Sequence, residues 1–249
     1  MHRFFVSPED IVDARVTLTG QVAVQLARVL RAQAGDRIVV LDDSGWEYRV
    51  TLETVALRRV TGTVTDKVRG EGEPGIPIIL YQAVLKSDRF EYVLQKGTEL
   101  GVSAFVPVFC ARSIPNGRSW ASKREQRWCN IVREAAEQSR RCRLPAIWPA
   151  VDFAEACERF EGDGLVPWEG EASMSLKTAL HRIKARKKPM RPRVGIFTGP
   201  EGGFTEREVK HARSKGIVAV TLGRRILRAE TAPIAAVSAV LYEFGDLGG

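Results

Sequence analysis

Two turns near the C-terminus have the residue types that bind a small ligand through the protein main chain. The first turn, residues 199–203 (Gly-Pro-Glu-Gly-Gly), follows the apolar run 194–198. Glycine adopts backbone conformations that are closed to other residues, so the main chain can approach a ligand closely there. The second turn, 223–232, follows the apolar run 217–222. We interpret the two runs as neighbouring strands, which brings both turns to one edge of a sheet and places a ligand between them.

The first turn matches neither of the common nucleotide-binding patterns. It lacks the Gly-x-Gly-x-x-Gly spacing of dinucleotide sites and the Lys-Ser/Thr pair of phosphate-binding loops. In addition, the carboxylate of Glu201 would repel a phosphate. The turn therefore suits a ligand that is neutral or positively charged and is held by backbone amides and carbonyls. Taken alone, these glycines are equally compatible with a simple tight turn.

The residues around the two turns predict one βαβ unit. Residues 205–208 (Thr-Glu-Arg-Glu) form a capping box, so a helix is predicted to begin there and to end at Gly216. The run 233–244 is apolar almost all round, which is typical of a helix in a core or in a dimer contact.

The rest of the chain divides at residues 70–77, which are polar and rich in Gly and Pro. Before this boundary, strands predicted at 37–42, 48–55 and 59–67 suggest a small β-barrel. After it, strands and helices alternate, which predicts an α/β domain with a mostly parallel sheet covered on both faces. Its further strands are predicted at 78–85, 104–109 and 164–168, and its further helices at 88–100, 122–142, 152–160 and 175–187.

Several separated segments together resemble the RsmE family of ribosomal RNA methyltransferases, within the SPOUT superfamily. The likeness rests first on the pairing of Gly-Pro-Glu-Gly-Gly-Phe at 199–204 with Leu-Gly-Arg-Arg-Ile-Leu-Arg-Ala-Glu-Thr-Ala at 222–232. It extends to residues 1–5, 30–36, 95–101 and 133–139. Position 229 departs from the family pattern, since Ala stands where Thr is frequent.

The resemblance implies a fold and an activity. It implies a PUA-like RNA-binding barrel over residues 1–72 and a methyltransferase domain over 73–249, with a C-terminal trefoil knot in which 223–232 tucks behind the loop after Thr198. It further implies a homodimer, S-adenosylmethionine as cofactor, and methylation of N3 of a uridine in 16S rRNA of the small ribosomal subunit. Ordinary α/β topology rules give no indication of a knot.

The same resemblance assigns site residues. Cofactor contacts are expected at Thr198, Gly199, Glu201, Gly202, Leu222, Gly223, Ile226 and Leu227. Arg228 and Glu230 are the candidates for catalysis, because an arginine favours the anionic uracil and a carboxylate either accepts a proton or fixes that arginine. RNA contacts are expected at Arg3, Arg31, Lys86, Arg133 and Arg141.

Composition adds constraints on partners and compartment. The net charge is +8, and the positive excess falls after residue 74. A polyanion would therefore gain most from the later part of the chain, although the densest basic run, 182–193, is also explained as a solvated helix end and linker. No membrane span, signal peptide or metal-ligand spacing is present, so we expect a cytoplasmic protein with no metal and no membrane partner. The four cysteines are predicted to be reduced, buried thiols.

Two interpretations from different classes remain at this stage. One is the methyltransferase; the other is a non-catalytic rRNA-binding assembly factor with a vestigial cofactor pocket. The intact glycine turn and the intact 222–232 segment favour the enzyme. Some other polar residues have a purely structural explanation. Lys96 and Glu99, three residues apart on a predicted helix, are spaced to form an ion pair with each other. The tryptophans are expected mostly in the core, with Trp168 ending a strand beside the cofactor site.

Overall fold

The structure is a computed structural model that describes residues 1–113, 124–186 and 192–248. It consists of two compact units, which are described separately. The first contains Met1–Glu73 and Ala136–Leu144, and the second contains Pro74–Ala135 and Pro145–Gly249. The sequence pattern predicts residues 136–144 in the later domain, whereas in the structure the chain returns here to the first unit.

The first unit is a six-stranded sheet with the strand order β1-β4-β5-β6-β3-β2. Its elements are β1 (Arg3–Phe5), η1 (Pro8–Asp10), β2 (Ile11–Val12), β3 (Arg15–Thr19), α1 (Gly20–Val24), η2 (Gln25–Val29), β4 (Arg37–Leu41), β5 (Trp46–Val55) and β6 (Arg59–Arg69). The three predicted strands are confirmed within two residues at each end. The strands do not close into a complete barrel, because β1 and β2 are left as edges.

Alternation of side chains explains how this sheet is covered on two faces. One face packs a core that includes Phe4, Ile38 and Val40, together with Leu26 from η2. The other face presents Val39 and Leu41, which pack with residues of the returning segment 136–144. The returning segment therefore belongs to the first unit for a physical reason, since it covers apolar side chains of β4.

The second unit is a seven-stranded sheet in which β10, β8, β7, β12, β11 and β13 follow one another and β9 also pairs with β8. Its strands are β7 (Ile78–Ala83), β8 (Ala104–Phe109), β9 (Ala146–Ile147), β10 (Val151–Asp152), β11 (Asp163–Pro167), β12 (Val194–Thr198) and β13 (Val218–Val220). Its helices are α2 (Ser87–Leu100), α4 (Glu125–Gln138, whose last three residues belong to the first unit), α5 (Phe153–Arg159), α6 (Leu176–Ala185), α7 (Glu206–Ser214) and α8 (Thr231–Phe244). Each pairing between the described strands is parallel, so the predicted parallel sheet is confirmed.

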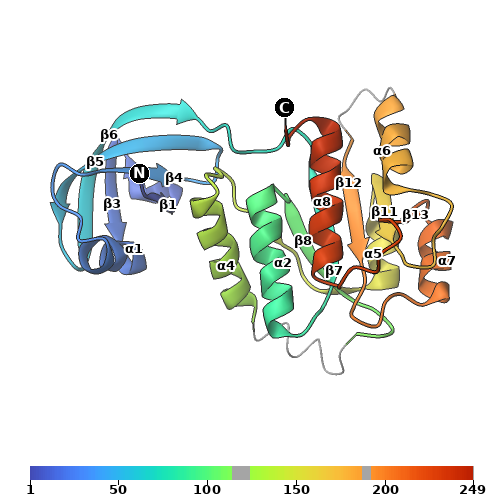
Figure 1. Cartoon of the computed structure of the whole chain (residues 1–249). Helices are drawn as coiled ribbons and strands as arrows, with labels where there is room; N and C mark the ends of the chain where they lie inside the picture. Colours follow the sequence, from blue (N-terminus) through green and yellow to red (C-terminus); the bar gives the residue numbers. More distant parts are fainter. Residues whose placement is uncertain (114–123, 187–191, 249) are drawn as a thin grey trace. The chain divides into compact units, whose positions relative to one another are not determined.

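Helices cover both faces of this sheet (Figure 1). On one face α2, α4, α6 and α8 enclose a core that contains Ile78, Leu80 and Ile196. On the other face α5 and α7 pack against Tyr81, Phe197 and their neighbours. Consecutive residues of β7 and β12 thus point to opposite cores, which explains why these strands are apolar without interruption. The parts of the predicted helices at 122–123 and 187 lie outside the described residues, as does Trp120.

Candidate functional site

A cleft lies at the carboxyl ends of β11, β12 and β13. It has a volume of about 530 Å³ and is lined by the turn after β12, by the loop before α8 and by residues that follow β11. A smaller hollow joins it along the loop after β13, and the two share Pro167, Glu169, Ile226, Leu227 and Ala232. Sites of small ligands in parallel sheets lie at this end of the strands and have volumes of about 300–1,000 Å³.

The strands that carry the two turns are not neighbours, which corrects the sequence prediction. β11 lies between β12 and β13 and pairs with both. A simple βαβ unit would place them side by side, but here the chain after α7 passes to the far side of β11. The consequence is a third loop at the site, which brings Glu169 to the cleft and Trp168 to the smaller hollow that joins it.

The turn after β12 is held open by contacts to its flanks. Gly203 has a backbone φ of +68°, which glycine adopts without strain. The guanidinium of Arg112 donates to the carbonyl of Gly202 at 2.8 Å. Behind the turn, the predicted capping box is confirmed, because Thr205 and Glu208 exchange hydrogen bonds at the start of α7. Backbone groups of the turn are therefore presented to the cleft on a fixed support.

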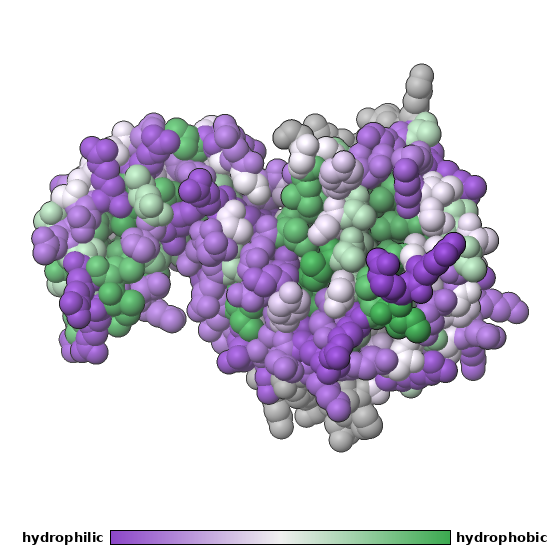
Figure 2. All heavy atoms as spheres, viewed as in Figure 1, coloured by the Kyte–Doolittle hydropathy of each residue, from purple (hydrophilic) through white to green (hydrophobic). Residues whose placement is uncertain are grey.

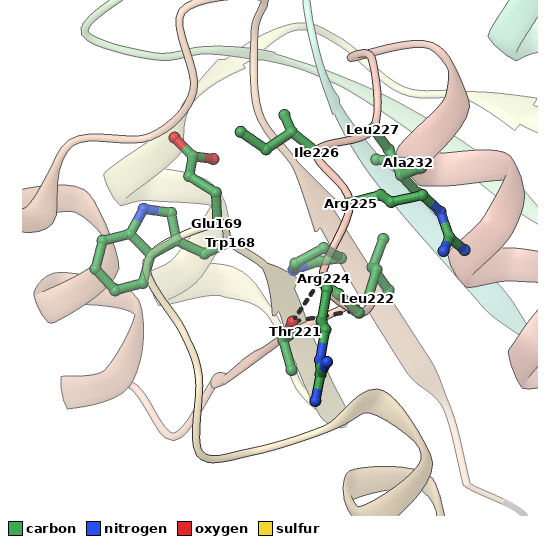
Figure 3. Close-up of a pocket in the computed structure, with 11 residues that line it drawn as sticks. Trp168, Glu169, Thr221, Leu222, Arg224, Arg225, Ile226, Leu227 and Ala232 are labelled. Atoms are coloured by element: carbon green, nitrogen blue, oxygen red, sulfur yellow. Dashed lines mark hydrogen bonds between the residues drawn. The ribbon is translucent and has the colours of Figure 1, made fainter.

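The loop after β13 forms the opposite wall of the site. The hydroxyl of Thr221 accepts a hydrogen bond from the amide of Gly223 at 3.1 Å and donates one to the carbonyl of Gly223 at 3.2 Å (dashed lines in Figure 3). Gly223 has a φ of +112°, and a Cβ added to it would have no heavy atom within 4 Å. Ile226 lines both hollows although its side chain is 87% exposed. An exposed aliphatic side chain over a cleft is suited to covering an apolar ring of a ligand.

The loop after β11 is fastened by one buried carboxylate, that of Glu171. It accepts from the amide and the hydroxyl of Ser173 and from the amide of Met174, and it pairs with Arg213. Arg213 in turn lies over the Trp168 ring, 5.8 Å from its centroid. The hydrogen bonds, first that from the Ser173 hydroxyl and then those from the two amides, lower the pKa of Glu171 to about 2 from its ordinary value of 4.5.

We expect Glu171→Gln to destabilise the protein at neutral pH, by on the order of 1 kcal/mol, because an amide accepts these hydrogen bonds less strongly than a carboxylate. The folded-state pKa is depressed, so the stabilisation is complete above about pH 4.5 and is lost as the pH falls towards 2. Urea unfolding of both proteins over this range measures the difference. A difference that does not change with pH would show that the carboxylate's charge plays no part.

The two proposed catalytic residues lie in the loop just before the last helix, α8, and Glu230 is its N-cap residue. Arg228 is exposed at the cleft, and its carbonyl accepts from the amides of Thr231 and Ala232 at 2.9 and 3.0 Å. The Glu230 side chain is 17% exposed, and one of its oxygens is buried with no hydrogen-bond partner among the described residues. The other oxygen of Glu230 forms an ion pair with Arg89 on α2, whose Nε lies 3.9 Å away, rather than with Arg228.

Arg89 also approaches the opposite wall of the cleft. Its guanidinium lies 3.6 Å from the carboxylate of Glu201, which additionally accepts from the amide of Lys86 at 3.3 Å. Arg89 therefore stands between a carboxylate of the turn after β12 and the carboxylate of Glu230. The charged side chains that line this cleft are two of each sign, Arg89 and Arg228 against Glu169 and Glu201, so the cleft has no net charge to favour a phosphate.

The predicted cofactor residues are brought together, with one difference. Gly199, Glu201, Gly202, Leu222, Gly223, Ile226 and Leu227 line the two hollows. Thr198 lies beneath the turn instead, where its buried hydroxyl donates to the buried side chain of Gln82 at 2.6 Å. Thr198 thus fixes the end of β12 against β7 and is placed to support the turn.

Two of the predicted RNA-binding arginines occupy interior positions of the first unit. The side chain of Arg141 is 3% exposed and binds Glu73 at 2.7 Å, and Arg3 forms a bidentate ion pair with Glu47. Both placements argue against a phosphate contact, and we assign these arginines to holding the unit together. Arg31, Lys86 and Arg133 are exposed.

Sequence reasoning missed Glu169 and gave no role to Arg89. A signal for Glu169 existed, because it follows a predicted strand and such positions face the ligand edge of a parallel sheet. No signal in the sequence placed Arg89 between two carboxylates from distant segments. The prediction that Lys96 and Glu99 bridge each other is confirmed, since their side chains form an ion pair at 2.7 Å.

The described residues contain no helix long and apolar enough to cross a membrane and no group of metal-ligating side chains. All four cysteines are free thiols. Cys142 and Cys157 are buried as predicted, whereas Cys110 is partly buried and Cys129 is exposed, which corrects the prediction for these two.

Comparison with known proteins agrees with the fold and the cleft. Residues 72–241 match the RNA methyltransferase domain family. The ribosomal RNA small subunit methyltransferase E of Bacillus subtilis is 33% identical over 254 residues, covering 100% of this chain and 99% of the relative. The protein of that name from Synechocystis is 35% identical, covering 96% of this chain and 77% of the relative. A crystal structure of a ribosomal RNA small subunit methyltransferase E from Neisseria gonorrhoeae, bound to S-adenosyl methionine, superposes on this chain with a TM-score of 0.84. The two sequences are 30% identical, and the superposition covers 97% of each chain.

The second unit, with a ligand cleft at the carboxyl ends of its parallel strands, is thus an RNA methyltransferase domain. With full-length relatives above 30% identity, the chain belongs to the ribosomal RNA small subunit methyltransferase E family. The resemblance stated from the sequence motifs is confirmed.

Proposed function

We propose that this chain transfers a methyl group from S-adenosylmethionine to N3 of a uridine in the 16S rRNA of the small ribosomal subunit. The observation that carries the proposal is the cleft formed by the glycine turn after β12 and the 222–232 loop, with Arg228 exposed at its edge. Family membership and the cofactor bound by the Neisseria relative support the same reaction.

The residues of the cleft fit this cofactor. The space beside Gly223 leaves main chain accessible, and Ile226 and Leu227 provide aliphatic surface for an adenine ring. The carboxylates of Glu169 and Glu201 suit the ribose hydroxyls and the positive charges of the methionine part. When bound, S-adenosylmethionine supplies a methyl group that is already activated by the positively charged sulfur.

The chain's own residues must then align the uracil and handle its N3 proton. We assign Arg228 to the anionic form of the uracil, since a cation at the cleft edge lowers the energy of the developing negative charge. We assign Glu230 to the proton, because its buried, unpartnered oxygen is available to accept one. Arg89, whose Nε lies 3.9 Å from the other oxygen of Glu230, is the cation that we assign to positioning this carboxylate.

Further features of the proposal concern fold and assembly. We infer a trefoil knot in which 223–232 passes behind the loop after Thr198. Two features support it: β13 lies beyond β11, and after β13 the chain returns to the middle of the sheet, where α8 packs against β7 and β12. We also infer that the first unit is a PUA-like RNA-binding domain. Exposed Arg31, Lys86 and Arg133 are the proposed phosphate contacts.

We infer a homodimer that forms through α8. Hydrophobic side chains reach the surface over α8 and the neighbouring α2 (Figure 2). Tyr242 on α8 is 70% exposed and Tyr92 on α2 is 46% exposed, so each of the two helices presents a large aromatic side chain at its surface. A surface of this kind is typical of a two-fold contact. Free thiols are consistent with a proposed location in the cytoplasm.

Calorimetric titration of the purified protein with S-adenosylmethionine tests the proposed function against the rRNA-binding factor with a vestigial pocket. We expect saturable binding at one site per chain. Sinefungin, which carries an amine in place of the methyl-bearing sulfur, should compete. A folded protein that binds RNA and gives no heat with either compound would exclude the methyltransferase.

A further inference from the structure

Two aromatic and two basic side chains share one face of the β5–β6 ribbon in the first unit. Trp46 pairs with Arg69 across the ribbon, and Tyr48 pairs with Lys67. Directly paired residues, and residues two apart on one strand, point to the same side of a sheet. The four side chains, which we name the ribbon cluster, therefore form one continuous surface of the first unit, whereas the cofactor cleft belongs to the second unit.

The geometry of the ribbon cluster places cations over aromatic faces. The Lys67 ammonium lies 5.0 Å from the ring centroids of both Trp46 and Tyr48, and the Arg69 guanidinium lies 5.3 Å from that of Trp46. The Tyr48 hydroxyl donates to Asp42 at 2.8 Å, which fixes the orientation of its ring. Both rings are half-buried, whereas Lys67 and Arg69 are exposed.

Among the residues that the structure describes, no carboxylate forms an ion pair with the two cations of the cluster, Lys67 and Arg69. Other basic residues of the same unit differ, since Arg3, Arg49 and Arg141 pair with Glu47, Asp66 and Glu73. Unpaired cations held beside accessible aromatic rings match a ligand that carries both negative charge and flat π-surfaces.

Single-stranded nucleic acid has this combination of phosphates and unstacked bases. We propose that the ribbon cluster binds an unpaired segment of the RNA substrate: Lys67 and Arg69 turn from the ring of Trp46 to the adjacent phosphates, and a base stacks on that ring in their place. The inference rests on the proposed function for the identity of the RNA. An acidic protein segment would engage the cations without requiring the ring, which separates the two partners experimentally.

The test uses the full-length protein, an unstructured RNA of about 12 nucleotides and a blunt duplex of the same sequence. Lys67→Gln/Arg69→Gln should weaken binding of the single strand about tenfold and flatten its salt dependence by about 1.4 in slope, as expected for two lost phosphate contacts. The matched control is Arg58→Gln/Arg59→Gln, which removes the same charge from exposed arginines at the other end of the ribbon. We expect the control to bind like wild type.

The contribution of stacking is measured with two substitutions of Trp46. Trp46→Phe should retain most of the affinity for the single strand, whereas Trp46→Leu, which keeps apolar bulk without a π-face, should lose about tenfold. Binding of the duplex should change little with either. Circular dichroism and the affinity for S-adenosylmethionine, measured on every variant, should stay at wild-type values and so report that fold and cleft are intact.

The outcomes separate this inference from the proposed function. Equal losses in the cluster and control variants, or a Trp46→Leu protein with wild-type affinity, would overturn the ribbon cluster while leaving the methyltransferase in place. Sensitivity to the charges but not to Trp46 would favour an acidic protein partner and would also overturn it. Failure of the wild-type protein to bind any RNA would instead contradict the proposed function.

Discussion

Arg228→Ala is expected to lower the rate of methyl transfer by about two to three orders of magnitude, with little change in affinity for S-adenosylmethionine. Arg228 lies at the edge of the cleft with its side chain exposed, and its hydrogen bonds to other described residues are made by its carbonyl. Loss of a charge that stabilises a developing anion costs about this much when the charge acts mainly in the transition state. Single-turnover transfer to small-subunit rRNA, together with calorimetry, separates the two quantities.

A matched control for this experiment is Arg207→Ala. Arg207 is an exposed arginine on α7 that does not line the cleft, and its loss removes the same charge from the protein. We expect wild-type turnover from it. Near wild-type turnover by Arg228→Ala would contradict the assignment and would transfer the role to Glu230 or to a residue of the second subunit in the proposed dimer.

Gly223→Val is expected to reduce the affinity for S-adenosylmethionine about a hundredfold. The residue has a φ of +112°, which a β-branched residue cannot adopt without strain, and it lines the hollow after β13. The loop must therefore change conformation where the cofactor is expected to contact main chain. Because the position is exposed and outside the core, the melting temperature should fall by only a few degrees.

Gly216→Val provides the comparison for this variant. Gly216 has a φ of +80° and, like Gly223, no heavy atom within 4 Å of an added Cβ, but it follows α7 away from the cleft. Similar strain at this position should reduce stability and leave cofactor affinity unchanged. Equal affinities for S-adenosylmethionine in the two valine variants would show that the loop at Gly223 does not contact the cofactor.

Local patterns were sufficient to predict most elements of the second unit. The capping box at Thr205, the glycine after α7 and the apolar runs of β8 and β12 are short-range signals, and the structure matches them. The glycine turn and the 222–232 segment also meet in one cleft, as the sequence predicted. These features depend on residues that are close in the chain, where backbone preferences and side-chain periodicity act directly.

Strand order was beyond the reach of such patterns. A run of apolar residues indicates a buried strand but does not say which strand lies beside it, so the insertion of β11 between β12 and β13 was not foreseen. The role of the loop after β11, with Glu169 at the cleft and Glu171 fastening it, was missed for this reason.

Long-range pairing also explains the errors in the first unit. The helix α1, the strand β3 and the returning segment 136–144 are recognised only through the apolar faces that they cover. Arg141 lies in a basic stretch of the sequence that is typical of a protein surface. Its ion pair with Glu73, which is distant in the chain, nevertheless places it inside the unit. Trp46 was expected in the core, but its position at the end of the β5–β6 ribbon leaves it half-buried.

The most direct test of the account is methylation of defined rRNA by the purified protein. Small subunits from cells lacking this protein should be incubated with S-adenosylmethionine that carries an isotopically labelled methyl group, and the rRNA should then be digested and mapped by mass spectrometry. We predict one labelled nucleotide, a uridine methylated at N3, that forms with the wild-type protein and at a much lower rate with Arg228→Ala. The absence of label from rRNA, in a preparation that binds both cofactor and subunit, would contradict the account.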